Sequence, residues 1–380
     1  MNINCTNIAI VGCGFVADYY VRTLENHPSL KVLGVMDRDP VRAEHFSKTY
    51  SLPKYATLES LLQDDRVQIV VNLTNPRSHF QVSKDALKAG KHVYSEKPLG
   101  MTLEEAQELV ELAEANCLEI SGAPCSLLGE TAQTLWKALR EQAIGRASLV
   151  YAEMDDGFVP AMAYQSWLSE SGTPWPYKDE FEVGCTLEHA GYYLTWFPAF
   201  FGPALSVTAF ADCTIPDKGV DNLDPPDAPD FSVACIKFAS GVVARLTCSI
   251  VASHDHELRI FGSTGVMYTE DCWFYRSPVY IKRRLKIRRK TIEGPLAQRY
   301  PLVGPVTQRQ KYRGAQQMDF ARGIADLAEA IQTKRSPRLS GRYSLHVNEM
   351  VLAIHYATAN GCTYRMKTDC PTVEPLPWAL

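Results

Sequence analysis

In the first 125 residues, short apolar runs rich in β-branched side chains alternate with segments of helical periodicity. The apolar runs predict strands buried on both faces, because they lack alternation with polar positions. The predicted strands cover 7–11, 31–36, 68–73, 92–95 and 118–121, and the predicted helices cover 15–27, 40–50, 57–63, 76–89 and 102–116. Strands that alternate with helices indicate right-handed βαβ units and a parallel, doubly wound sheet.

The pattern changes beyond residue 147, where longer strand-like segments follow one another with few helices between them. These segments cover 149–154, 206–211, 231–238, 242–251, 257–261 and 266–270, and further helical patterns cover 131–142, 315–333 and 344–360. Successive strands without crossover helices indicate an antiparallel sheet. We therefore predict an N-terminal α/β domain at 1–124, a C-terminal α+β domain with an open, mostly antiparallel sheet at 125–369, and an irregular tail at 370–380.

Residues 190–211 carry no formal charge and are long enough to cross a bilayer. Pro198 and the Gly202-Pro203 pair interrupt the stretch, which therefore predicts a buried helix, a turn and a strand. The net charge of −4 gives no footprint for nucleic-acid binding. Eleven cysteines without a C-x-x-C pair, and an N-terminus without a signal-peptide pattern, favour a reduced cytoplasmic protein with no membrane partner.

The segment 282–290 is the one dense run of basic residues in the chain. Such a run is typical of a solvated strand or loop, here with Leu285 and Ile287 turned inward. A nuclear signal or a patch for a polyanion is the alternative interpretation.

The first predicted strand leads directly into the motif G-x-G-x-x-A, formed by Gly12, Gly14 and Ala17. Gly12 would allow a tight turn, and Gly14 would let a pyrophosphate approach the backbone at a helix N-terminus. Asp37 ends the second strand 23 residues after Gly14, where an acid that binds the adenosine ribose is expected. The combination predicts a dinucleotide site.

Asp37 also bears on the choice of cofactor. A carboxylate at this position would repel the 2′-phosphate of NADP, so the sequence favours NAD. Arg38 follows directly, and its guanidinium could either stack on adenine or bind that phosphate. NADP therefore stays as the less favoured alternative.

Two later motifs carry a family resemblance: Thr74-Asn75-Pro76-x-x-His79, and A-G-K-H-V-x-x-E-K-P-L at 89–99. With the glycine motif, they resemble the Gfo/Idh/MocA oxidoreductases, and the resemblance implies an N-terminal Rossmann domain. It also implies that Lys97 lies beside the nicotinamide and the reacting hydroxyl, and that the Lys97-Pro98 peptide is cis. The cofactor-binding residues expected from these motifs are Gly12, Gly14, Phe15, Val16, Asp37, Arg38, Thr74, Asn75, Pro76, His79, Glu96 and Lys97.

The chain departs from this family in its second domain. Members usually carry D-x-G-x-H on a helix, whereas here Glu188 takes the Asp position and Tyr192 takes the His position. Spacing of i, i+4 would place both side chains on one helix face. A tyrosine can carry the hydroxyl proton if a nearby ammonium lowers its pKa, so the expected catalytic residues are Lys97, Tyr192 and Glu188. His189 would have to swing to replace the missing histidine.

Aromatic and polar side chains alternate in the loop that precedes this helix. Trp175 and Asp179, with Lys97, Glu188, His189 and Tyr192, are the expected substrate-binding residues. Such a composition suits the apolar faces and hydroxyl rim of a sugar ring, but equally a dimer contact. Tyr193 is expected to be a core residue. His254 and His256 flank Asp255, and without a third ligand we interpret them as surface or dimer-edge residues and predict no metal site.

The sequence as a whole predicts an NAD-dependent oxidoreductase that acts on a sugar, a cyclitol or a related polyol. One alternative is an enzyme that keeps NAD bound and recycles it, for isomerisation or glycoside cleavage. The other is a sensor that binds the dinucleotide without turnover, although such a protein need not retain Lys97. The uncovered face of the second sheet predicts a homodimer or homotetramer.

Overall fold

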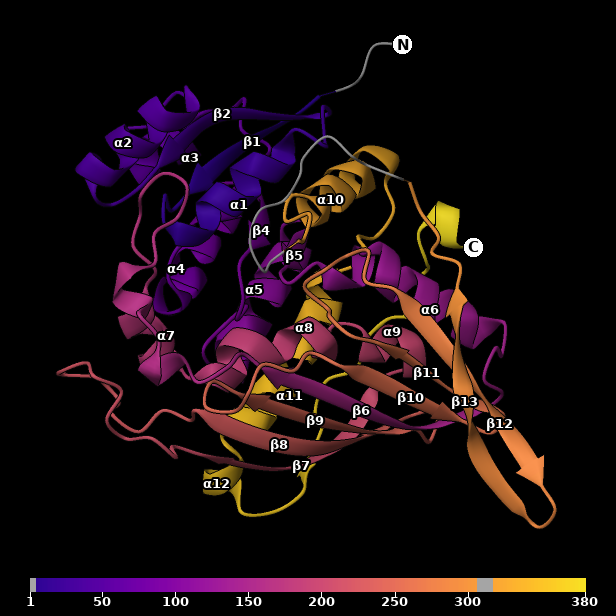
Figure 1. Ribbon diagram of the computed structural model, residues 1–380. Coiled ribbons are helices and arrows are strands. Elements are labelled where there is room, and N and C mark those ends of the chain that lie inside the picture. The colour runs from indigo at the N-terminus through magenta and orange to yellow at the C-terminus, as the bar shows by residue number, and fades with distance from the viewer. Residues whose placement is uncertain (1–4, 306–316) are drawn as a thin grey trace. The chain divides into compact units, whose positions relative to one another are not determined.

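The computed structural model describes residues 5–305 and 317–380, which form two compact units (Figure 1). Of the described residues, the first unit comprises 5–125, 163–180 and 319–348. The second unit comprises 126–162, 181–305, 317–318 and 349–380. Both units are therefore assembled from segments that lie far apart in the sequence.

The first unit contains a five-stranded, fully parallel sheet, which confirms the predicted Rossmann fold. Its strands, in the spatial order β2-β1-β3-β4-β5, are β1 (Thr6–Val11), β2 (Leu30–Met36), β3 (Ile69–Asn72), β4 (His92–Ser95) and β5 (Ile120–Gly122). The connecting helices are α1 (Phe15–Leu24), α2 (Pro40–Tyr50), α3 (Leu58–Leu62), α4 (Pro76–Lys88) and α5 (Leu103–Ala115). The strand order reverses between β1 and β3, so the carboxyl ends of these strands are the expected place for a ligand.

Two later segments of the chain complete the first unit. Within 163–180, the backbone N–H and hydroxyl of Ser171 donate to Oδ2 of Asp18 in α1, at 3.0 and 2.9 Å. Helix α10 (Arg322–Thr333) follows Ala321, whose N–H donates to the Thr23 hydroxyl oxygen at 3.0 Å. The predicted helix at 315–333 thus begins at Arg322, and its residues 315 and 316 lie outside the described part of the chain. Helix α11 (Gly341–His355) comes next.

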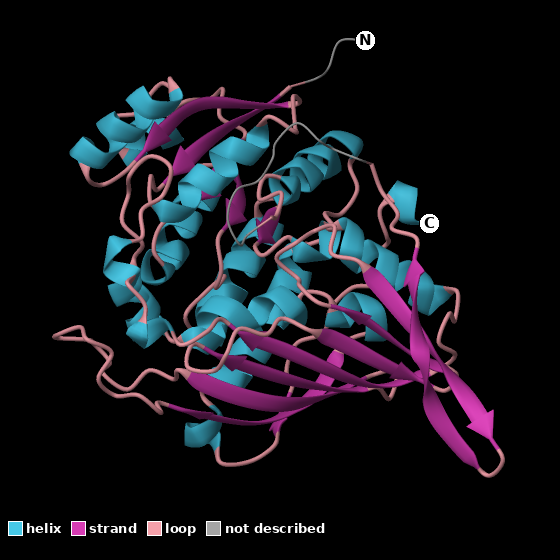
Figure 2. Ribbon diagram, in the orientation of Figure 1, coloured by secondary structure: helices cyan, strands magenta, loops and turns pink. Residues whose placement is uncertain are grey.

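The second unit contains a nine-stranded sheet in which only β6 and β9 pair in parallel, as predicted for a mostly antiparallel sheet. Its strands are β6 (Ala147–Asp155), β7 (Ala204–Asp212), β8 (Phe231–Phe238), β9 (Val243–Ser249), β10 (Leu258–Gly262), β11 (Gly265–Thr269), β12 (Val279–Ile287), β13 (Lys290–Tyr300) and β14 (Tyr364–Arg365). Helices α6 (Glu130–Arg140), α8 (Gly191–Leu194) and α9 (Phe197–Phe201) lie along one side of the sheet (Figure 2). Shorter helices are α7 (Tyr177–Val183) and α12 (Ala357–Asn360).

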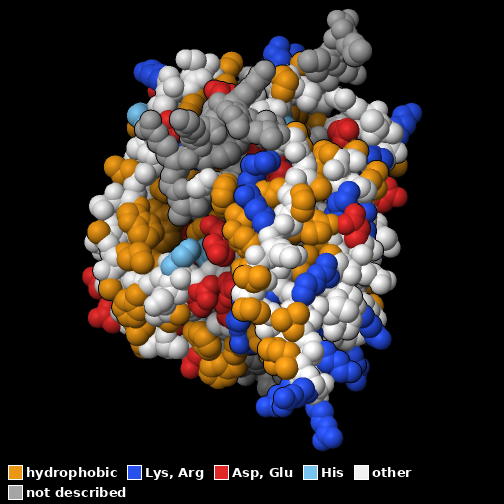
Figure 3. Space-filling model, turned by 45° about the vertical axis from the view of Figure 1, so that its right-hand side comes forward, with side chains coloured by type: hydrophobic (Ala, Val, Ile, Leu, Met, Phe, Trp, Pro, Cys, Tyr) orange, Lys and Arg blue, Asp and Glu red, His pale blue; other side chains and the backbone are white. Residues whose placement is uncertain are grey.

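The basic run lies in the β12–β13 hairpin, which the strand prediction did not include. It is a solvated strand, as favoured, but the inward placement of Leu285 and Ile287 is wrong, since they are 43% and 53% exposed. The reason is geometric: the far end of the hairpin pairs only with itself, Leu285 with Ile292 and Ile287 with Lys290, so no neighbouring layer covers either face. Figure 3 shows Lys and Arg gathered with apolar side chains at the lower end of the molecule, where this hairpin lies.

The uncharged stretch at 190–211 forms α8, α9, a Gly202-Pro203 turn and the beginning of β7, in agreement with the prediction. Among the described residues, no helix combines the length and the apolar character that a membrane span needs. All eleven cysteines are free thiols.

Candidate functional site

The glycine turn between β1 and α1 is held against two neighbouring strands. The N–H of Gly12 donates to the Met36 carbonyl at 2.8 Å, and φ of Gly12 is +99°. A Cβ at Gly12 would lie 2.4 Å from the Leu73 carbonyl oxygen, so only glycine fits there. A Cβ at Gly14, the N-cap of α1, would meet nothing within 4 Å. Gly14 therefore leaves open space at a helix N-terminus, which suits a phosphate.

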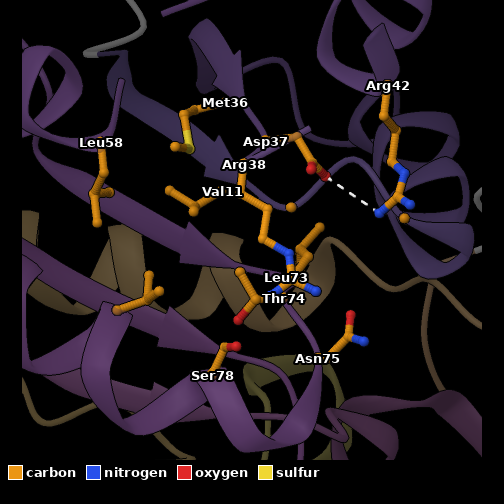
Figure 4. Close-up of a pocket in the computed structure, with 13 residues that line it drawn as sticks. Val11, Met36, Asp37, Arg38, Arg42, Leu58, Leu73, Thr74, Asn75 and Ser78 are labelled. Carbon is orange, nitrogen blue, oxygen red and sulfur yellow. Dashed lines mark ion pairs between the residues drawn. The ribbon is translucent and has the colours of Figure 1, made fainter. Parts of the chain in front are cut away.

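A pocket lies at the carboxyl ends of β1, β2 and β3, in front of this turn (Figure 4). It is lined by Val11, Gly12, Gly14, Met36, Asp37, Arg38, Arg42, Leu58, Leu73, Thr74, Asn75, Ser78 and Val82. Six of the expected cofactor-binding residues line it: Gly12, Gly14, Asp37, Arg38, Thr74 and Asn75. Phe15, Val16, Pro76, His79, Glu96 and Lys97 are absent from the lining. Glycines at a helix N-terminus, an acid at the end of β2 and apolar walls fit an adenine dinucleotide.

Asp37 is fixed in the pocket by backbone donors. Its Oδ2 accepts from the N–H of Cys13 and its Oδ1 from the N–H of Asp39, both at 2.8 Å. Arg42 forms an ion pair with the same carboxylate at 3.8 Å (Figure 4), and Arg38 also lines the pocket. Arg42 thus pairs with this carboxylate, and Arg38 brings a second guanidinium group to the same pocket. Burial and the nearby Asp37 raise the pKa of Cys13 to about 12, so this thiol is no nucleophile at neutral pH.

The loop after β4 carries Glu96 and Lys97, and it is held by buried contacts. Glu96 accepts from the Tyr20 hydroxyl at 2.7 Å and from the N–H of Lys97 at 3.0 Å. The Lys97-Pro98 peptide is cis, as the resemblance implied. The ring nitrogens of buried His79 lie 2.8 Å from the carbonyl oxygens of Thr74 and Pro98. His79 therefore ties the loop after β3 to the loop that presents Lys97.

The expected substrate residues of the 163–180 segment belong to the first unit. The Asn75 amide donates to the carboxylate of Asp179, so Asp179 lies at the edge of the dinucleotide pocket. Trp175 packs against Trp167, with ring centroids 4.9 Å apart, and against Tyr164 at 6.3 Å. The structure thus brings a carboxylate and an aromatic cluster to the unit that holds the glycine turn.

The other expected residues lie in the second unit, on one helical segment. Thr186–Ala190 is a π-helical turn that continues into α8, and such turns are common at functional sites. Glu188 in the π turn and Tyr192 in α8 are 5% and 7% exposed. Trp273 packs edge-on against both His189 and Tyr192, with centroids 6.0 and 5.6 Å away. Tyr193 is fully buried, as expected of a core residue.

A cluster of histidines and carboxylates lies beside this segment. Nε2 of His256 bonds to Oδ1 of Asp156 at 2.8 Å, and Nδ1 of His189 contacts Oδ2 of the same carboxylate. The placement of His256 at a surface or dimer edge is wrong, since it is 1% exposed beneath the ring of Trp273, whereas His254 is exposed. Burial raises the pKa of Asp156, but the two imidazoles outweigh it and hold this pKa below its usual range. Burial lowers the pKa of His256, but the Asp156 and Asp271 carboxylates raise it by more, so the pKa of His256 lies above its usual value.

Arg42, Asp156 and Trp273 are site residues that the sequence interpretation did not include. Arg42 lies five residues after Asp37, in the first turn of α2, and this spacing was a usable signal. Asp156 follows a strand end, and its partners His189 and His256 are 33 and 100 residues away. Only the pairing of the second sheet brings these groups together.

Comparison with known proteins adds three findings. Residues 6–121 match an oxidoreductase family with an NAD-binding Rossmann fold, and residues 132–268 match the Gfo/Idh/MocA C-terminal domain. The trans-1,2-dihydrobenzene-1,2-diol dehydrogenase of Oryctolagus cuniculus is 25% identical over 279 residues, which cover 72% of this chain and 79% of that protein.

Two solved structures share the fold. The aldose-aldose oxidoreductase of Caulobacter crescentus, complexed with glycerol, superposes with a TM-score of 0.74 at 18% identity, over 95% of this chain and all of that one. The 3-ketoreductase KijD10 of Actinomadura kijaniata, complexed with NADP, gives a TM-score of 0.69 at 20% identity, over 93% of this chain and 98% of that one. These likenesses extend over both units.

Proposed function

The chain belongs to the Gfo/Idh/MocA family of NAD(P)-binding oxidoreductases, and we propose that it transfers a hydride between NAD and a carbinol carbon of a sugar, cyclitol or related polyol. The observation that carries this proposal is the intact Glu96-Lys97-Pro98 loop, fixed in the same unit as the glycine turn. A protein that only bound the dinucleotide would have no need of an ammonium group at that position.

The proposed chemistry gives each candidate residue a separate role. When bound, the nicotinamide supplies the hydride acceptor or donor. The Lys97 ammonium stabilises the alkoxide that develops as the hydroxyl loses its proton. In the proposed step Tyr192 acts as a phenolate, takes up that proton and becomes the neutral phenol. Glu188 acts with Tyr192, and Glu96 orients the lysine loop through its bond to the Lys97 N–H.

A sugar or polyol is the substrate class that the candidate residues suit best. Trp175 offers an apolar face, and Asp179 beside it offers acceptors for hydroxyl groups. His189 and Tyr192, which belong to the second unit, are the other substrate-binding residues of the proposal. The names of the similar proteins, an aldose-aldose oxidoreductase, a 3-ketoreductase and a dihydrodiol dehydrogenase, support this substrate class.

The test is a panel of polyols with NAD and of keto-sugars with NADH, followed through the absorbance of the reduced nicotinamide. We expect one structural class to change this absorbance at a rate proportional to enzyme concentration. A transient that stops at one equivalent per chain would instead favour the alternative in which NAD stays bound and is recycled. No change with any member, despite tight dinucleotide binding, would favour the sensor.

We propose NAD as the preferred cofactor, because the fixed carboxylate of Asp37 at the end of β2 would repel a ribose 2′-phosphate. NAD and NADH should therefore raise the melting temperature more than NADP and NADPH do. Arg38 and Arg42 are the groups that oppose this preference, since both could bind the phosphate. Arg42→Ala should weaken the binding of NADP further and leave the binding of NAD almost unchanged. Equal stabilisation of the parent protein by NADP would contradict the proposal.

We further propose that the chain forms a homodimer or homotetramer through the open face of the nine-stranded sheet. A row of directly paired residues crosses this face in the order Tyr280, Tyr268, Arg259, Tyr151, Arg245 and Cys235. The Arg245 guanidinium lies 4.4 Å from the centre of the Tyr151 ring, and Tyr268 stacks on Tyr280. Tyrosine and arginine are enriched at protein interfaces.

Light scattering at micromolar concentration should give twice or four times the chain mass of 42.4 kDa. Tyr151→Glu should shift the particle toward the monomer, because the change removes the aromatic ring in the middle of this row and would bury a carboxylate in the interface. Glu59→Gln, an exposed change on α3 of the other unit, is the control. A monomeric parent protein would refute the proposed assembly.

We propose the cytoplasm as the location of the protein, because the pattern of cysteines in the sequence is typical of a reducing compartment.

A further inference from the structure

The backbone brings an aspartate and two histidines of the second unit to one face. Asp155 at the end of β6 pairs with Asp255 as an isolated antiparallel bridge, with N–H to carbonyl distances of 3.0 and 2.9 Å in the two directions. Side chains alternate along each paired segment. The residues next to the bridge, Asp156 on one segment and His254 and His256 on the other, therefore point to the opposite side from Asp155 and Asp255.

The three side chains converge on one point. One ligand atom from each of Asp156, His254 and His256 lies within 4.8 Å of the other two. The Asp156 side chain is 7% exposed and that of His256 is fully buried, whereas His254 is exposed and gives access from solvent. The rings of His254 and His256 lie with their centroids 4.3 Å apart, beside the same carboxylate.

The surroundings hold these donors in place. Nε2 of His256 faces Asp156, and its Nδ1 lies 3.4 Å from Oδ1 of Asp271, which accepts from the N–H of Trp273 at 2.7 Å. A metal-binding histidine usually donates its second ring nitrogen to a carboxylate in this way. His189 contacts the other oxygen of Asp156, and the Trp273 ring, 4.5 Å from His256, covers the cluster.

We propose that Asp156, His254 and His256 bind one divalent transition-metal ion of the zinc and cobalt class. Two imidazoles and one carboxylate suit these ions and not magnesium or calcium, which prefer oxygen ligands. If Asp156 and His256 formed only a structural hydrogen-bonded pair, no second histidine would be needed beside them. The strand bridge nevertheless brings the exposed His254 to the same point, which favours a metal site. The site lies wholly within the second unit, so its occupancy does not depend on the dinucleotide pocket.

The test is a titration of chelator-treated, full-length protein with Co²⁺, followed by visible absorption and by the metal content after gel filtration. We expect one Co²⁺ per chain, displaced by Zn²⁺, with the weak visible bands of a nitrogen–oxygen site. His254→Ala should weaken Co²⁺ binding at least tenfold, and its exposed position makes a folding defect improbable as a cause. Asp156→Asn should weaken it further, with circular dichroism and NADH binding as measures of folding.

Two matched variants separate this site from adventitious binding. His45→Ala removes an exposed histidine of the first unit, and Cys235→Ser removes an exposed thiol. Both should bind Co²⁺ like the parent protein. The proposal is overturned if the parent binds less than half an equivalent, if His254→Ala binds with unchanged affinity, or if the spectrum shows intense thiolate charge-transfer bands that vanish in Cys235→Ser. Each of these results leaves the proposed oxidoreductase activity untouched.

Discussion

Replacement of Lys97 by alanine should lower the turnover number about 10²- to 10⁴-fold, the usual loss when a group that moves or stabilises the transferred proton is removed. The ammonium is needed only as the hydroxyl oxygen becomes an alkoxide. Lys97 does not line the pocket at the glycine turn, so the dinucleotide should bind Lys97→Ala with nearly the affinity of the parent protein. Single-turnover rates and NADH titrations measure the two quantities separately.

Lys88→Ala, an exposed change at the end of α4, is the control and should leave both quantities unchanged. Tyr192→Phe should show a smaller loss of turnover than Lys97→Ala, because Glu188 or His189 can carry part of the proton transfer. If Lys97→Ala turns over like the parent, the lysine has a structural role. The chemistry must then be sought at His189 or around Trp175 and Asp179.

The Rossmann half of the molecule was predictable because its information is local. Each strand is a short apolar run, and three of the five helices begin at a side-chain cap, formed by Asp39, Thr57 or Thr102. The glycine motif lies between the first strand and the first helix. The five strands and helices accordingly agree with the sequence within a few residues. Asp37 was found from its distance to Gly14, since both belong to the same βαβ unit.

The second unit shows where local information ends. The far end of the β12–β13 hairpin is strongly basic, so it was interpreted as a solvated strand or loop and was not placed among the strands of the predicted sheet. The same alternation suggested that Leu285 and Ile287 turn inward, which holds only where another layer covers the strand. The prediction for His256 was wrong for a related reason. The burial of this side chain depends on its contacts with Trp273 and Asp156, and the sequence around residue 256 does not indicate these contacts.

The composition of the first unit is also a property of tertiary structure. The segment 163–180 is assigned to it by the bonds of Ser171 to Asp18 and of Asp179 to Asn75. Neither interaction has a signature in the sequence, because the partners are more than a hundred residues apart. The aromatic loop could be recognised as a candidate substrate site, but not as a neighbour of the dinucleotide pocket.

The two glycines of the turn should respond differently to the same added methyl group. Gly12→Ala should both destabilise the fold, by about 1–3 kcal/mol, and abolish dinucleotide binding. Its φ of +99° is unfavourable for alanine, and the new Cβ would lie 2.4 Å from the Leu73 carbonyl oxygen, forcing the glycine turn away from the residues that follow β3. Thermal unfolding and NADH titration measure the two effects.

Gly14→Ala should keep the stability of the parent, because φ of Gly14 is −82° and its Cβ would meet no protein atom within 4 Å. The methyl group would instead occupy the space at the N-terminus of α1 that a pyrophosphate needs, so NADH affinity should fall at least tenfold. This variant therefore separates binding from folding, which Gly12→Ala cannot do. If Gly14→Ala binds NADH as tightly as the parent, the pyrophosphate does not lie over this turn, and the assignment of the pocket is wrong.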